Sequence, residues 1–599
     1  MAVFLNGWKR SCMCGEVSET MQDKQITVIG WVQRVRNIGG IIFVWLRDRT
    51  GIVQLVFNEQ NMGEGLYKDA ESLRSEFVIG VRGKVAMRDE SEINKDMKTG
   101  KVEIHADELA IFNEAQTPPI YIEDNAKDNE AVRLKYRYLD LRKPSVQQTL
   151  FMRSKVVNTI RNHMLSEGFI EVETPILTKS TPEGARDFLV PSRIHAGECY
   201  ALPQSPQIYK QLLMVGGFDR YFQFAKCFRD EDSRADRQPE FTQLDMEMSF
   251  VEPKDIQGVI EGAFNSVFEE ITGRGLKLPL PRITWKEAME RFGSDKPDTR
   301  FKMEITDVTE QVQNCGFSIF ESACKDGNVV VGINAKGVAD KLSRKNMDAL
   351  AEFVKTYHVK GLAWYSIRSD GSVRSSFKKF LNADAEEKLI NTMDLEKGDA
   401  MFFVADKKIT ALTAMGQLRL KLGKEFDFID NKRHDLLWIT EFPMFEYSEK
   451  DNRYVAAHHP FTMPMVEDFE LFDTNPYAVR AQSYDLVMDG VEMGSGSIRI
   501  HLSEVQEKMF NLLGFSKEEA WQRFGFLLEA FKYGTPPHGG FAFGIDRLIM
   551  TLSGKESLRD VIAFPKAQNA SCLMMNSPSP VPQEQLDMLH MKFDLNKQD

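Results

Sequence analysis

The sequence lacks several features that would assign it at once to a large class of proteins. Its seven cysteines are scattered over 599 residues, and the one C-x-C pair, Cys12 and Cys14, has no second pair that would complete a zinc spacing. No apolar run approaches the roughly 18 residues of a membrane span, and the first residues show no apolar core of a signal peptide. These absences favour a reduced, cytoplasmic protein that does not enter a membrane.

The chain also has no excess of basic residues. Its formal net charge is −12, so any contact with nucleic acid must come from a local basic patch rather than from the overall field. A hydrophobic content of 42% is ordinary and allows a sizeable buried core. The length predicts about three or four domains.

The first domain is expected over residues 1–113. Five short segments rich in β-branched and aromatic residues, at 26–31, 41–47, 53–57, 77–81 and 102–105, predict a small barrel. In the second segment Ile42, Val44 and Leu46 fall on one face, and Phe43, Trp45 and Arg47 fall on the other. Aromatic side chains facing outward beside Arg34, Arg36 and Arg49 favour stacking of unpaired bases, although a surface covered by another domain remains the alternative.

The stretch that follows predicts a link and then helices. Residues 114–137 are polar and contain a Pro-Pro pair, which is typical of a hinge. Apolar side chains at helical spacing predict a helix over residues 152–165. Glu183 lies in a polar loop, where it could meet a ligand ammonium or remain in solvent. Ser205 and Pro206 predict the start of a helix that places Gln207 and Lys210 on one face, where the lysine could pair with a substrate carboxylate.

The strongest pattern in the first half is a predicted hairpin. Residues 221–229 and 241–250 alternate between apolar and polar side chains, and residues 230–240 between them are densely charged. On the second strand Leu244, Met246, Met248 and Phe250 share one face, and Gln243, Asp245, Glu247 and Ser249 share the other. A face this polar must bind a polar ligand or lie in water, so a solvated surface hairpin is the alternative.

Residues 283–415 differ in character from the sequence around them. Strand-like segments at 329–333, 362–367 and 401–404 and a helix-like segment at 344–357 predict an inserted α+β domain without a catalytic constellation. Beyond it lie His458 and His459. No carboxylate spacing supports a metal site there, so ligand contact or a structural turn is favoured.

A second hairpin is predicted over residues 484–499. The Asp-Gly dipeptide at 489–490 is typical of a two-residue turn, and it places Val487 opposite Glu492. Asp485 and Glu492 then face the same way and could share a divalent ion, for which oxygen ligands favour Mg²⁺; two exposed acids are the alternative. Arg499 follows and could hold a carboxylate through two nitrogens.

We interpret residues 539–547, Gly-Gly-Phe-Ala-Phe-Gly-Ile-Asp-Arg, as the stretch around which the rest of the chain is organised. Three glycines would leave room for a flat ring against the backbone, and Arg547 places a permanent cation at its edge. That combination favours a purine nucleotide with phosphates nearby. A glycine-rich turn beside a surface arginine is the alternative, because short glycine motifs have many false positives.

Together these stretches resemble the class II aminoacyl-tRNA synthetases, and within them the bacterial-type aspartyl-tRNA synthetases. The matching signatures are the stretch ending at Pro175, the stretch from Phe228 through Gln238 and Glu240, and the stretch ending at Arg547. The resemblance implies a multidomain α+β fold: an N-terminal OB-fold β-barrel that binds the anticodon, and an antiparallel-sheet catalytic domain with an inserted α+β domain. The expected divisions are 1–113 for the barrel, 114–137 for the hinge, 138–282 and 416–565 for the two catalytic parts, 283–415 for the insertion and 566–599 for a C-terminal extension.

The resemblance also implies residue roles. Arg229 and Arg547 would be catalytic, and ATP would be bound by Arg229, Asp230, Glu231, Gln238, Glu492, Gly544, Ile545, Asp546 and Arg547. Asp485 and Glu492 would hold Mg²⁺. Aspartate would be bound by Glu183, Gln207, Lys210, Arg229, Asp245, His458, His459 and Arg499. Arg36, Phe43, Gln54 and Glu103 would meet the anticodon, and Pro175 would lie at a homodimer interface.

The implied reaction is activation of L-aspartate with ATP and transfer to tRNA(Asp). Ile38 resembles the apolar residue of family members restricted to that tRNA, whereas Ser91 departs from the lysine often found at its position, so charging of tRNA(Asn) stays open. Three other interpretations remain: a sister enzyme for asparagine or lysine, an amide-forming ligase that ignores tRNA, and a non-catalytic RNA-binding paralogue.

Overall fold

The computed structural model describes residues 4–180, 185–232, 234–448 and 452–594. Contacts divide the chain into two compact units. The first contains Met1–Arg153, Ser233–Gln238 and Ser553–Val581, and the second contains Ser154–Asp232, Pro239–Leu552 and Pro582–Asp599. Among the described residues, no helix is long and apolar enough to cross a membrane.

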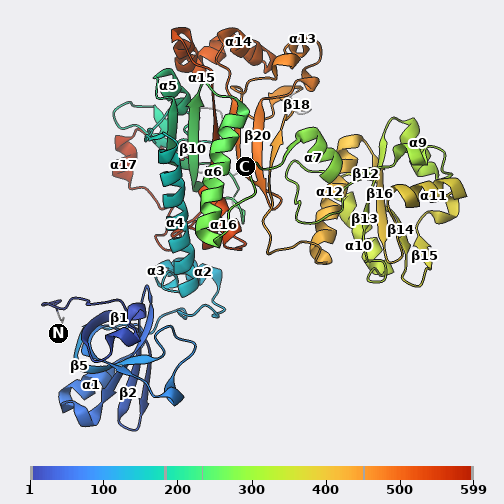
Figure 1. Ribbon diagram of the computed structural model, residues 1–599. Coiled ribbons are helices and arrows are strands. Elements are labelled where there is room, and N and C mark those ends of the chain that lie inside the picture. Colours follow the sequence, from blue (N-terminus) through green and yellow to red (C-terminus); the bar gives the residue numbers. More distant parts are fainter. Residues whose placement is uncertain (1–3, 181–184, 233, 449–451, 595–599) are drawn as a thin grey trace. The chain divides into compact units, whose positions relative to one another are not determined.

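The first unit contains a closed barrel with the strand order β1-β2-β3-β5-β4, which confirms the predicted OB-fold (Figure 1). Its strands are β1 (Gln25–Ile38), β2 (Ile41–Asp48), β3 (Gly51–Asn58), β4 (Val78–Met87) and β5 (Val102–Asn113). Ile42, Val44 and Leu46 are buried in the barrel core, as their spacing predicts. Helices α1 (Glu64–Ser72), α2 (Glu130–Lys135) and α3 (Arg137–Asp140) also belong to this unit.

One residue of β2 does not lie where the alternation places it. Arg47 was expected on the outward face, but its side chain is buried and its Nη2 donates to Glu76 Oε1 at 2.9 Å. Arg142 donates to the same carboxylate at 2.7 Å. A buried cation is retained here because a buried carboxylate pairs with it, and the alternation of β2 carries no information about that distant partner.

The second unit is built on an eight-stranded sheet with the order β11-β17-β20-β21-β22-β10-β9-β6. The outer pairs β11–β17 and β6–β9 are parallel, and the other neighbours are antiparallel. The strands are β6 (Ile170–Glu171), β9 (Arg220–Phe228), β10 (Glu240–Ser249), β11 (Arg282–Thr284), β17 (Leu436–Thr440), β20 (Ser483–Met488), β21 (Val491–Ile498) and β22 (His538–Gly544). Both predicted hairpins, β9–β10 and β20–β21, are present.

Helix α6 (Pro253–Thr272) covers the apolar face of this sheet. Phe264 on the helix lies with its ring centroid 5.1 Å from that of Phe543 on β22. Leu244, Met246 and Met248 are fully buried on β10, as predicted. Phe250 was expected to continue that face, but the strand ends at Ser249 and Phe250 has a φ of 59° and a side chain that is 72% exposed. The change of backbone conformation turns its ring away from the core.

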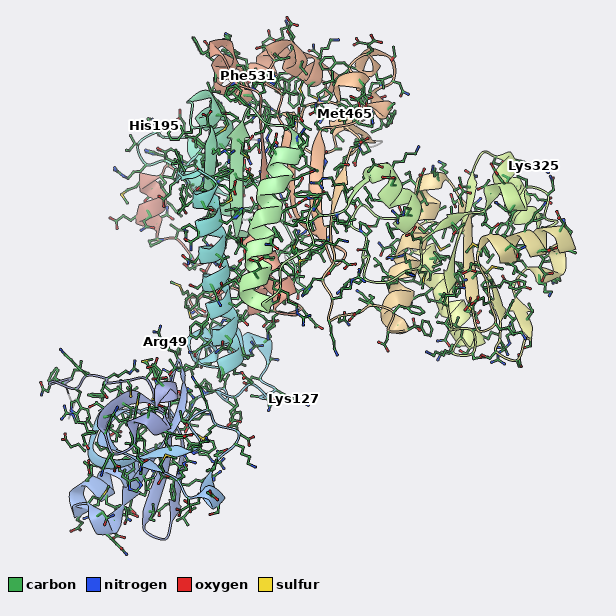
Figure 2. The ribbon with its side chains drawn as sticks, in the orientation of Figure 1. Arg49, Lys127, His195, Lys325, Met465 and Phe531 are labelled. Atoms are coloured by element: carbon green, nitrogen blue, oxygen red, sulfur yellow. The ribbon has the colours of Figure 1, made fainter. Side chains whose placement is uncertain are left out.

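The inserted region forms its own five-stranded sheet, in the order β12-β13-β16-β14-β15. Alternate residues of β13 and β16 face two separate cores: Ile333 and Phe402 pack toward α10 and α12, and Val330 and Phe403 pack toward α9 and α11. Side chains therefore fill both faces of this sheet (Figure 2). Its elements are β12 (Thr306–Asp307), α8 (Thr309–Val312), α9 (Ser318–Lys325), β13 (Val329–Ala335), α10 (Arg344–Lys355), β14 (Ala363–Ile367), β15 (Val373–Ser375), α11 (Ala383–Thr392), β16 (Ala400–Asp406) and α12 (Lys408–Glu425).

The remaining elements surround the eight-stranded sheet or extend the chain. They are α4 (Pro144–Ser166), whose residues from Ser154 onward belong to the second unit, β7 (Leu189–Pro191), β8 (Cys199–Ala201), α5 (Gln207–Val215), α7 (Trp285–Phe292), β18 (Phe445–Ser448), β19 (Arg453–Ala456), α13 (Leu471–Thr474), α14 (Ser503–Leu512), α15 (Lys517–Ala530), α16 (Ile545–Leu552) and α17 (Gln583–Met588). Helix α5 begins one residue later than expected, and the Gln207 N–H donates to Ser205 Oγ at 3.3 Å.

Candidate active site

The polar face of the eight-stranded sheet is organised in two rows that cross the strands. In the first row Gln223, Asp245, Ala542, Ser495 and Asp485 lie opposite one another on β9, β10, β22, β21 and β20. In the second row the opposed residues are Tyr221, Glu247, Gly540, Ser497 and Ser483. Directly opposed residues point to the same face of an antiparallel sheet. Five strands from three separate stretches of the sequence therefore contribute to one surface.

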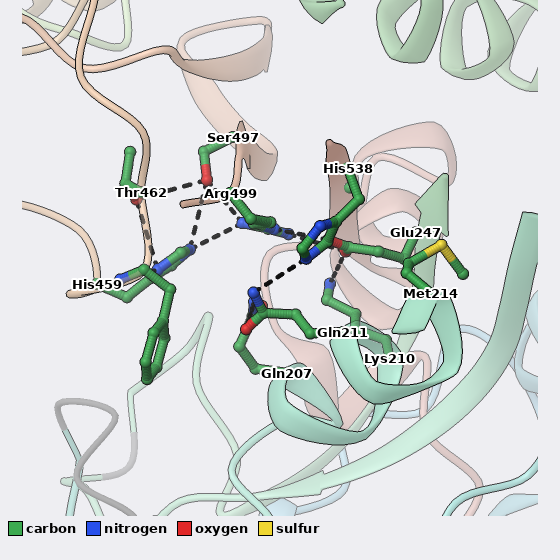
Figure 3. Close-up of polar contacts among 12 residues, drawn as sticks. Gln207, Lys210, Gln211, Met214, Glu247, His459, Thr462, Ser497, Arg499 and His538 are labelled. Carbon is green, nitrogen blue, oxygen red and sulfur yellow. Dashed lines mark hydrogen bonds and ion pairs between the residues drawn. The ribbon is translucent and has the colours of Figure 1, made fainter. Parts of the chain in front are cut away.

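Four charged side chains are buried together on this surface, and Figure 3 labels three of them, Lys210, Glu247 and Arg499. Lys210 Nζ on α5 lies 2.9 Å from Asp245 Oδ1 and 3.3 Å from Glu247 Oε2. Arg499 donates from Nε to Glu247 Oε1 at 2.8 Å and from Nη2 to Glu247 Oε2 at 3.1 Å. All four side chains are at most 2% exposed. The alternative of a solvated surface hairpin is therefore wrong for these residues.

The two carboxylates of this cluster differ in how well they are satisfied. Burial would raise the pKa of Glu247, but Arg499 and Lys210 together hold that pKa below its ordinary value. Burial raises the pKa of Asp245, and Lys210 offsets this only in part. Asp245 Oδ2 accepts no hydrogen bond from any described residue. A buried carboxylate oxygen without a donor is a suitable place for a ligand cation.

Arg499 uses most of its donors within the protein. Besides the two bonds to Glu247, its Nη1 donates to Ser497 Oγ at 2.7 Å and to His459 Nε2 at 2.8 Å. His459 must accept the latter bond, because a guanidinium can only donate. Burial and the neighbouring Arg499 charge hold the pKa of His459 well below its ordinary value, so this imidazole is neutral. His458 is stacked edge-on against Phe442, with ring centroids 4.9 Å apart.

Three residues of this pocket were not identified from the sequence as site residues: Glu247, Gln211 and His538. Gln211 and His538 are fully buried, and the nitrogen Gln211 Nε2 lies 3.2 Å from His538 Nε2. Gln207 Nε2 donates to Gln211 Oε1 at 3.4 Å. A sequence signal for each did exist. Glu247 lies two residues from Asp245 on the same strand face, Gln211 lies one helical turn after Gln207, and His538 directly precedes the glycine-rich stretch.

The ends of the same strands gather a second group of residues. Arg229 follows β9, and its guanidinium carbon lies 5.1 Å from the ring centroid of Phe241 at the start of β10. Arg229 Nε is buried and has no hydrogen-bond partner among the described residues. Arg547, on α16, donates from Nη1 to the Glu492 backbone oxygen at 2.7 Å. Because β22 and β9 both pair with β10 and run antiparallel to it, Arg229 and Gly544 lie at the same end of the sheet.

Other residues expected at this end have structural contacts of their own. Asp546 is buried, and its Oδ2 accepts from the Thr242 backbone N–H at 2.9 Å. Ile545 is fully buried, whereas a Cβ added at Gly544 would meet only the Arg547 Cβ within 4 Å. The Asp230 backbone N–H donates to Arg186 O at 3.0 Å. Gly544 is thus the one glycine of the motif whose Cα faces open space; Gly539 and Gly540 are closely covered by protein atoms.

Asp485 and Glu492 influence each other electrostatically. Burial and the Glu492 charge raise the pKa of Asp485 well above its ordinary value. Burial would also raise the pKa of Glu492, but Lys296, whose Nζ lies 2.9 Å from Glu492 Oε2, lowers it. Asp485 Oδ1 is buried without a hydrogen-bond partner among the described residues. No group of three or more His, Cys, Asp or Glu in the described part of the chain is arranged to hold a metal ion.

The remaining expected site residues have other contacts or lie outside the described part of the chain. Glu183 lies outside the described residues. Gln238 belongs to the first unit, where its side-chain amide exchanges hydrogen bonds with the backbone of Lys566 at 2.9 and 3.2 Å. Glu231 follows Arg229 in the loop after β9, where its backbone N–H donates to Arg229 O. Pro175 is exposed after the short edge strand β6, close in sequence to the exposed Ile176 and Leu177.

The residues expected to meet an anticodon form one face of the barrel. Arg36 on β1 lies opposite Phe43 on β2, and Trp45 lies opposite Gln54 on β3. The guanidinium carbons of Arg34 and Arg36 lie 5.6 and 5.5 Å from the Trp45 ring centroid.

Hydrogen bonds extend this face. Trp45 Nε1 donates to Gln54 Oε1 at 3.2 Å, and Gln54 Nε2 donates to Glu103 Oε2 at 3.0 Å. Ile38, at the end of β1, is 61% exposed, and Ser91 is exposed after β4. The face combines flat rings, cations and ordered polar groups.

Comparisons with known proteins agree with this architecture of a barrel and an antiparallel sheet. A family described as "tRNA synthetases class II (D, K and N)" matches residues 129–568, and the family "OB-fold nucleic acid binding domain" matches residues 26–112. The chain belongs to the class II tRNA synthetases of this group.

Similar sequences span the whole chain. An aspartate–tRNA ligase of Ruminiclostridium cellulolyticum is 54% identical over 99% of this chain and 100% of its own length. An aspartate–tRNA(Asp/Asn) ligase of Anoxybacillus flavithermus is 54% identical over 98% and 100%. Among solved structures, a putative aspartyl-tRNA synthetase from Leishmania major Friedlin has a TM-score of 0.59 at 20% identity, covering 94% of this chain and 96% of its own, and this likeness concerns the fold alone.

Proposed function

We propose that this chain is an ATP-dependent aspartate–tRNA ligase that forms aspartyl-adenylate and then transfers aspartate to the 3′ end of tRNA(Asp). The observation that carries the substrate assignment is the buried pair of cations, Lys210 and Arg499, on a surface where Asp245 Oδ2 has no donor among the described residues. Lys210 and Arg499 would pair with the side-chain carboxylate of aspartate, and Asp245 would pair with its ammonium. The full-length similarity to ligases named for aspartate supports the same assignment.

The proposed pocket selects aspartate by charge. An asparagine amide in place of the carboxylate would leave Lys210 and Arg499 without a full counter-charge, which a buried site penalises strongly. Glu247 accepts hydrogen bonds from Nε and Nη2 of Arg499. The substrate carboxylate would therefore contact the other edge of the guanidinium, which Nη1 and Nη2 form. In this structure His459 accepts a hydrogen bond from Arg499 Nη1. With substrate bound, His459 and His458 would face the amino acid. Gln207, Asp245 and Glu183 are proposed to meet the ammonium.

The end of the sheet that carries Arg229 and Arg547 is proposed to bind ATP. Arg229 would hold the α-phosphate, and Arg547 the γ-phosphate. The ring of Phe241, beside Arg229, offers a flat apolar surface for the adenine. Asp230, Glu231, Gln238, Glu492, Gly544, Ile545 and Asp546 are the other proposed contacts.

The residues present fit a magnesium ion. Asp485 offers a buried carboxylate oxygen that no described residue satisfies, and Glu492 supplies a second carboxylate beside it. Oxygen ligands of this kind, combined with phosphate oxygens and water, are typical of Mg²⁺ in nucleotide sites. When bound, the ion would supply neutralisation of phosphate charge.

The chemistry then follows from charge. The α-carboxylate of aspartate attacks the α-phosphorus of ATP, an oxygen–phosphorus bond forms, and the bond to the β-phosphate oxygen breaks to release pyrophosphate. Negative charge grows on the α-phosphate, where Arg229 stabilises it. No protein nucleophile is required. In the second step a hydroxyl of the terminal tRNA ribose attacks the carbonyl carbon of the mixed anhydride, and AMP leaves.

The barrel face with Phe43, Arg36, Gln54 and Glu103 is proposed to bind the anticodon, by stacking on the ring and by polar contacts to base edges. We further propose that the chain forms a homodimer through the surface near Pro175, because Ile170, Ile176 and Leu177 leave exposed apolar area there. The domain divisions 1–113, 114–137, 138–282, 283–415, 416–565 and 566–599 are retained as proposals.

The direct test is ATP–pyrophosphate exchange with single amino acids. Exchange is expected with L-aspartate and not with L-asparagine or L-lysine. Exchange driven by asparagine or lysine but not by aspartate would overturn the assignment, and exchange without tRNA charging would indicate an amide-forming ligase.

A second acceptor, tRNA(Asn), is favoured by a specific observation: the Anoxybacillus flavithermus relative, and another from Lachnoclostridium phytofermentans that is 53% identical over 98% of this chain, are named for both tRNAs. Charging of purified tRNA(Asp) and tRNA(Asn) separates the possibilities. A kcat/KM for aspartylation of tRNA(Asn) within a few-fold of that for tRNA(Asp) would support the wider function. No aspartylation of tRNA(Asn) would restrict the enzyme to tRNA(Asp).

A further inference from the structure

A chain of buried hydrogen bonds runs from a backbone carbonyl to Gln207 (Figure 3). His538 Nδ1 lies 2.8 Å from the Pro536 backbone oxygen, and His538 Nε2 lies 3.2 Å from Gln211 Nε2. Gln211 Oε1 accepts from Gln207 Nε2 at 3.4 Å. Gln211 and His538 are fully buried, and Gln207 is 8% exposed. Because these groups are buried, we expect each of them to find its hydrogen-bond partner within the chain.

The carbonyl at one end determines the direction of every bond in the chain. A backbone oxygen can only accept, so His538 Nδ1 carries the proton and donates to it. Burial lowers the pKa of His538, so the imidazole is neutral and its Nε2 is an acceptor. Gln211 must then present its NH₂ to His538 and its oxygen to Gln207. Gln207 in turn presents its NH₂ to Gln211, and its oxygen lies on the opposite branch of the amide.

We propose that Gln211 and His538 are positioning residues, which fix the side-chain amide of Gln207 so that its oxygen, and not its nitrogen, faces the α-ammonium of the amino acid. This inference rests on the proposed function, in which Gln207 meets that ammonium. The two ends of a glutamine amide have nearly the same shape but opposite polarity. Without a fixed orientation, the NH₂ group would be presented to a cation in part of the molecules, and a ligand contact would become a repulsion.

The test compares aspartate with succinate, which has both carboxylates but no ammonium. Gln211→Met removes the acceptor for Gln207 Nε2, and it is expected to weaken aspartate binding by roughly tenfold to a hundredfold while changing succinate binding little. Gln211→Glu keeps an acceptor facing Gln207 and is expected to retain most of the preference for aspartate over succinate. Gln257→Met, which removes a buried amide on α6 that accepts from Arg282, is the matched control and should leave the ratio of the two affinities unchanged.

Calorimetric titration of each variant with aspartate and with succinate gives the ratio directly. Equal weakening of both ligands by Gln211→Met would mean a merely structural role and would overturn the proposal, as would no weakening of either. If Gln211→Met does not fold, Gln207→Glu tests whether the oxygen or the nitrogen of the Gln207 amide faces the ligand. A carboxylate has oxygen on both branches, so the preference for aspartate should persist or increase, and a lost preference would show that the nitrogen of Gln207 faces the ligand. Failure of the proposed function is seen separately, as absence of aspartate-dependent pyrophosphate exchange in the unsubstituted chain.

Discussion

Arg499 shows how one buried side chain can serve the fold and the proposed site together. Its Nε and Nη2 hold Glu247, and its Nη1 reaches Ser497 and His459. The planar guanidinium allows these contacts at fixed angles, which the single ammonium of a lysine cannot reproduce. Glu247 in turn is shared with Lys210. A substitution at any of the four charged residues therefore changes the charge balance of all of them.

Arg499→Lys is expected to lower kcat/KM for aspartate by roughly tenfold to a hundredfold, since the loss of a hydrogen bond to a charged group costs about 1.5–3 kcal/mol. The reason is that Glu247 keeps at most one of its two hydrogen bonds. ATP–pyrophosphate exchange at varied aspartate and varied ATP measures the effect. The KM for ATP should change little, and an equal rise in both KM values would contradict a role confined to the aspartate pocket.

Asp485→Asn is expected to stabilise the folded protein and to inactivate it. The raised pKa of Asp485 means that its buried charge, next to Glu492, disfavours the folded state at neutral pH, and an amide removes that charge. A gain of about 1 kcal/mol or more is expected, seen as a higher melting temperature in buffer without magnesium. Pyrophosphate exchange should fall by at least about a hundredfold, because a proposed ion ligand is lost.

The control is Asp489→Asn, on the turn of the same hairpin. Asp489 Oδ1 accepts from the Asp435 backbone N–H at 2.9 Å, and Oδ2 lies 2.6 Å from His434 Nδ1. This carboxylate is satisfied, so the same substitution should lower the melting temperature. Destabilisation by both substitutions would contradict the electrostatic argument for Asp485.

Acid is expected to destabilise the protein through its buried histidines. His459 has a pKa held well below its ordinary value by burial and by Arg499, whereas the unfolded chain takes up a proton near pH 6.5. The unfolded state therefore binds more protons below about pH 6.5, and the free energy of unfolding falls as the pH drops through that value. His459→Asn keeps an acceptor without a titrating group.

The measurement is the decrease in melting temperature between pH 7.5 and pH 5.5 for both proteins. It should be smaller in His459→Asn. Asp245 and Asp485, whose pKa values are raised, act in the opposite direction, but they do so in both proteins and largely cancel in the comparison. An equal decrease in the two proteins would show that His459 is not a proton-linked group.

At the scale of elements, β22 fits between its neighbours only because it is rich in glycine. A Cβ on Gly540 would overlap Glu247 Oε2 and the Met246 backbone oxygen, and a Cβ on Gly494 or Gly496 of β21 would overlap backbone oxygens of β22. The sequence indicated a glycine-rich surface open to a ligand ring. The structure shows instead that Gly540 makes room for the Glu247 carboxylate, so the glycine motif would shape the proposed amino-acid pocket as well as the proposed nucleotide end.

Gly540→Ala is expected to destabilise the protein by about 1–3 kcal/mol, the usual cost of overpacking, and to raise the KM for aspartate, since Glu247 must move away from Arg499. Gly258→Ala is the control. It lies in α6 with no atom within 4 Å of the added Cβ, where alanine should stabilise the helix by roughly 0.5–1 kcal/mol. Thermal unfolding and exchange kinetics of both variants give the comparison, and an unchanged aspartate KM in Gly540→Ala would refute the link to Glu247.

Elements were predictable where a local period determines them. The barrel strands, the two catalytic hairpins, α4 and the alternation of β10 all follow from hydrophobic spacing and turn residues. Long-range partners were not predictable. Arg47 was assigned to the wrong environment because Glu76 lies on another segment, and Gln211 and His538 were missed because their relation depends on two elements 327 residues apart.

At the scale of the whole molecule, a net charge of −12 has to coexist with binding of a polyanion. The proposed anticodon face of the barrel would resolve this locally, since Arg34 and Arg36 flank Trp45 next to Phe43. We propose that these cations attract phosphate while the neighbouring ring of Phe43 stacks a base. If these proposed sites are right, recognition of tRNA and activation of aspartate rest on different residues, and each should be impaired without the other.

Phe43→Ala is therefore expected to separate the two activities. Loss of one base-stacking ring costs roughly 1–3 kcal/mol, so kcat/KM for tRNA(Asp) in the charging reaction should fall by about fivefold to a hundredfold. Pyrophosphate exchange, which needs no tRNA, should remain at the unsubstituted rate. The control for a general loosening of the barrel is Phe57→Leu, because Phe57 is fully buried in the barrel core. It should lower the melting temperature while changing kcat/KM for tRNA(Asp) less than Phe43→Ala does. If Phe43→Ala charged tRNA(Asp) normally, base stacking on this ring would be excluded, and recognition would have to rest on the polar side chains of the face alone.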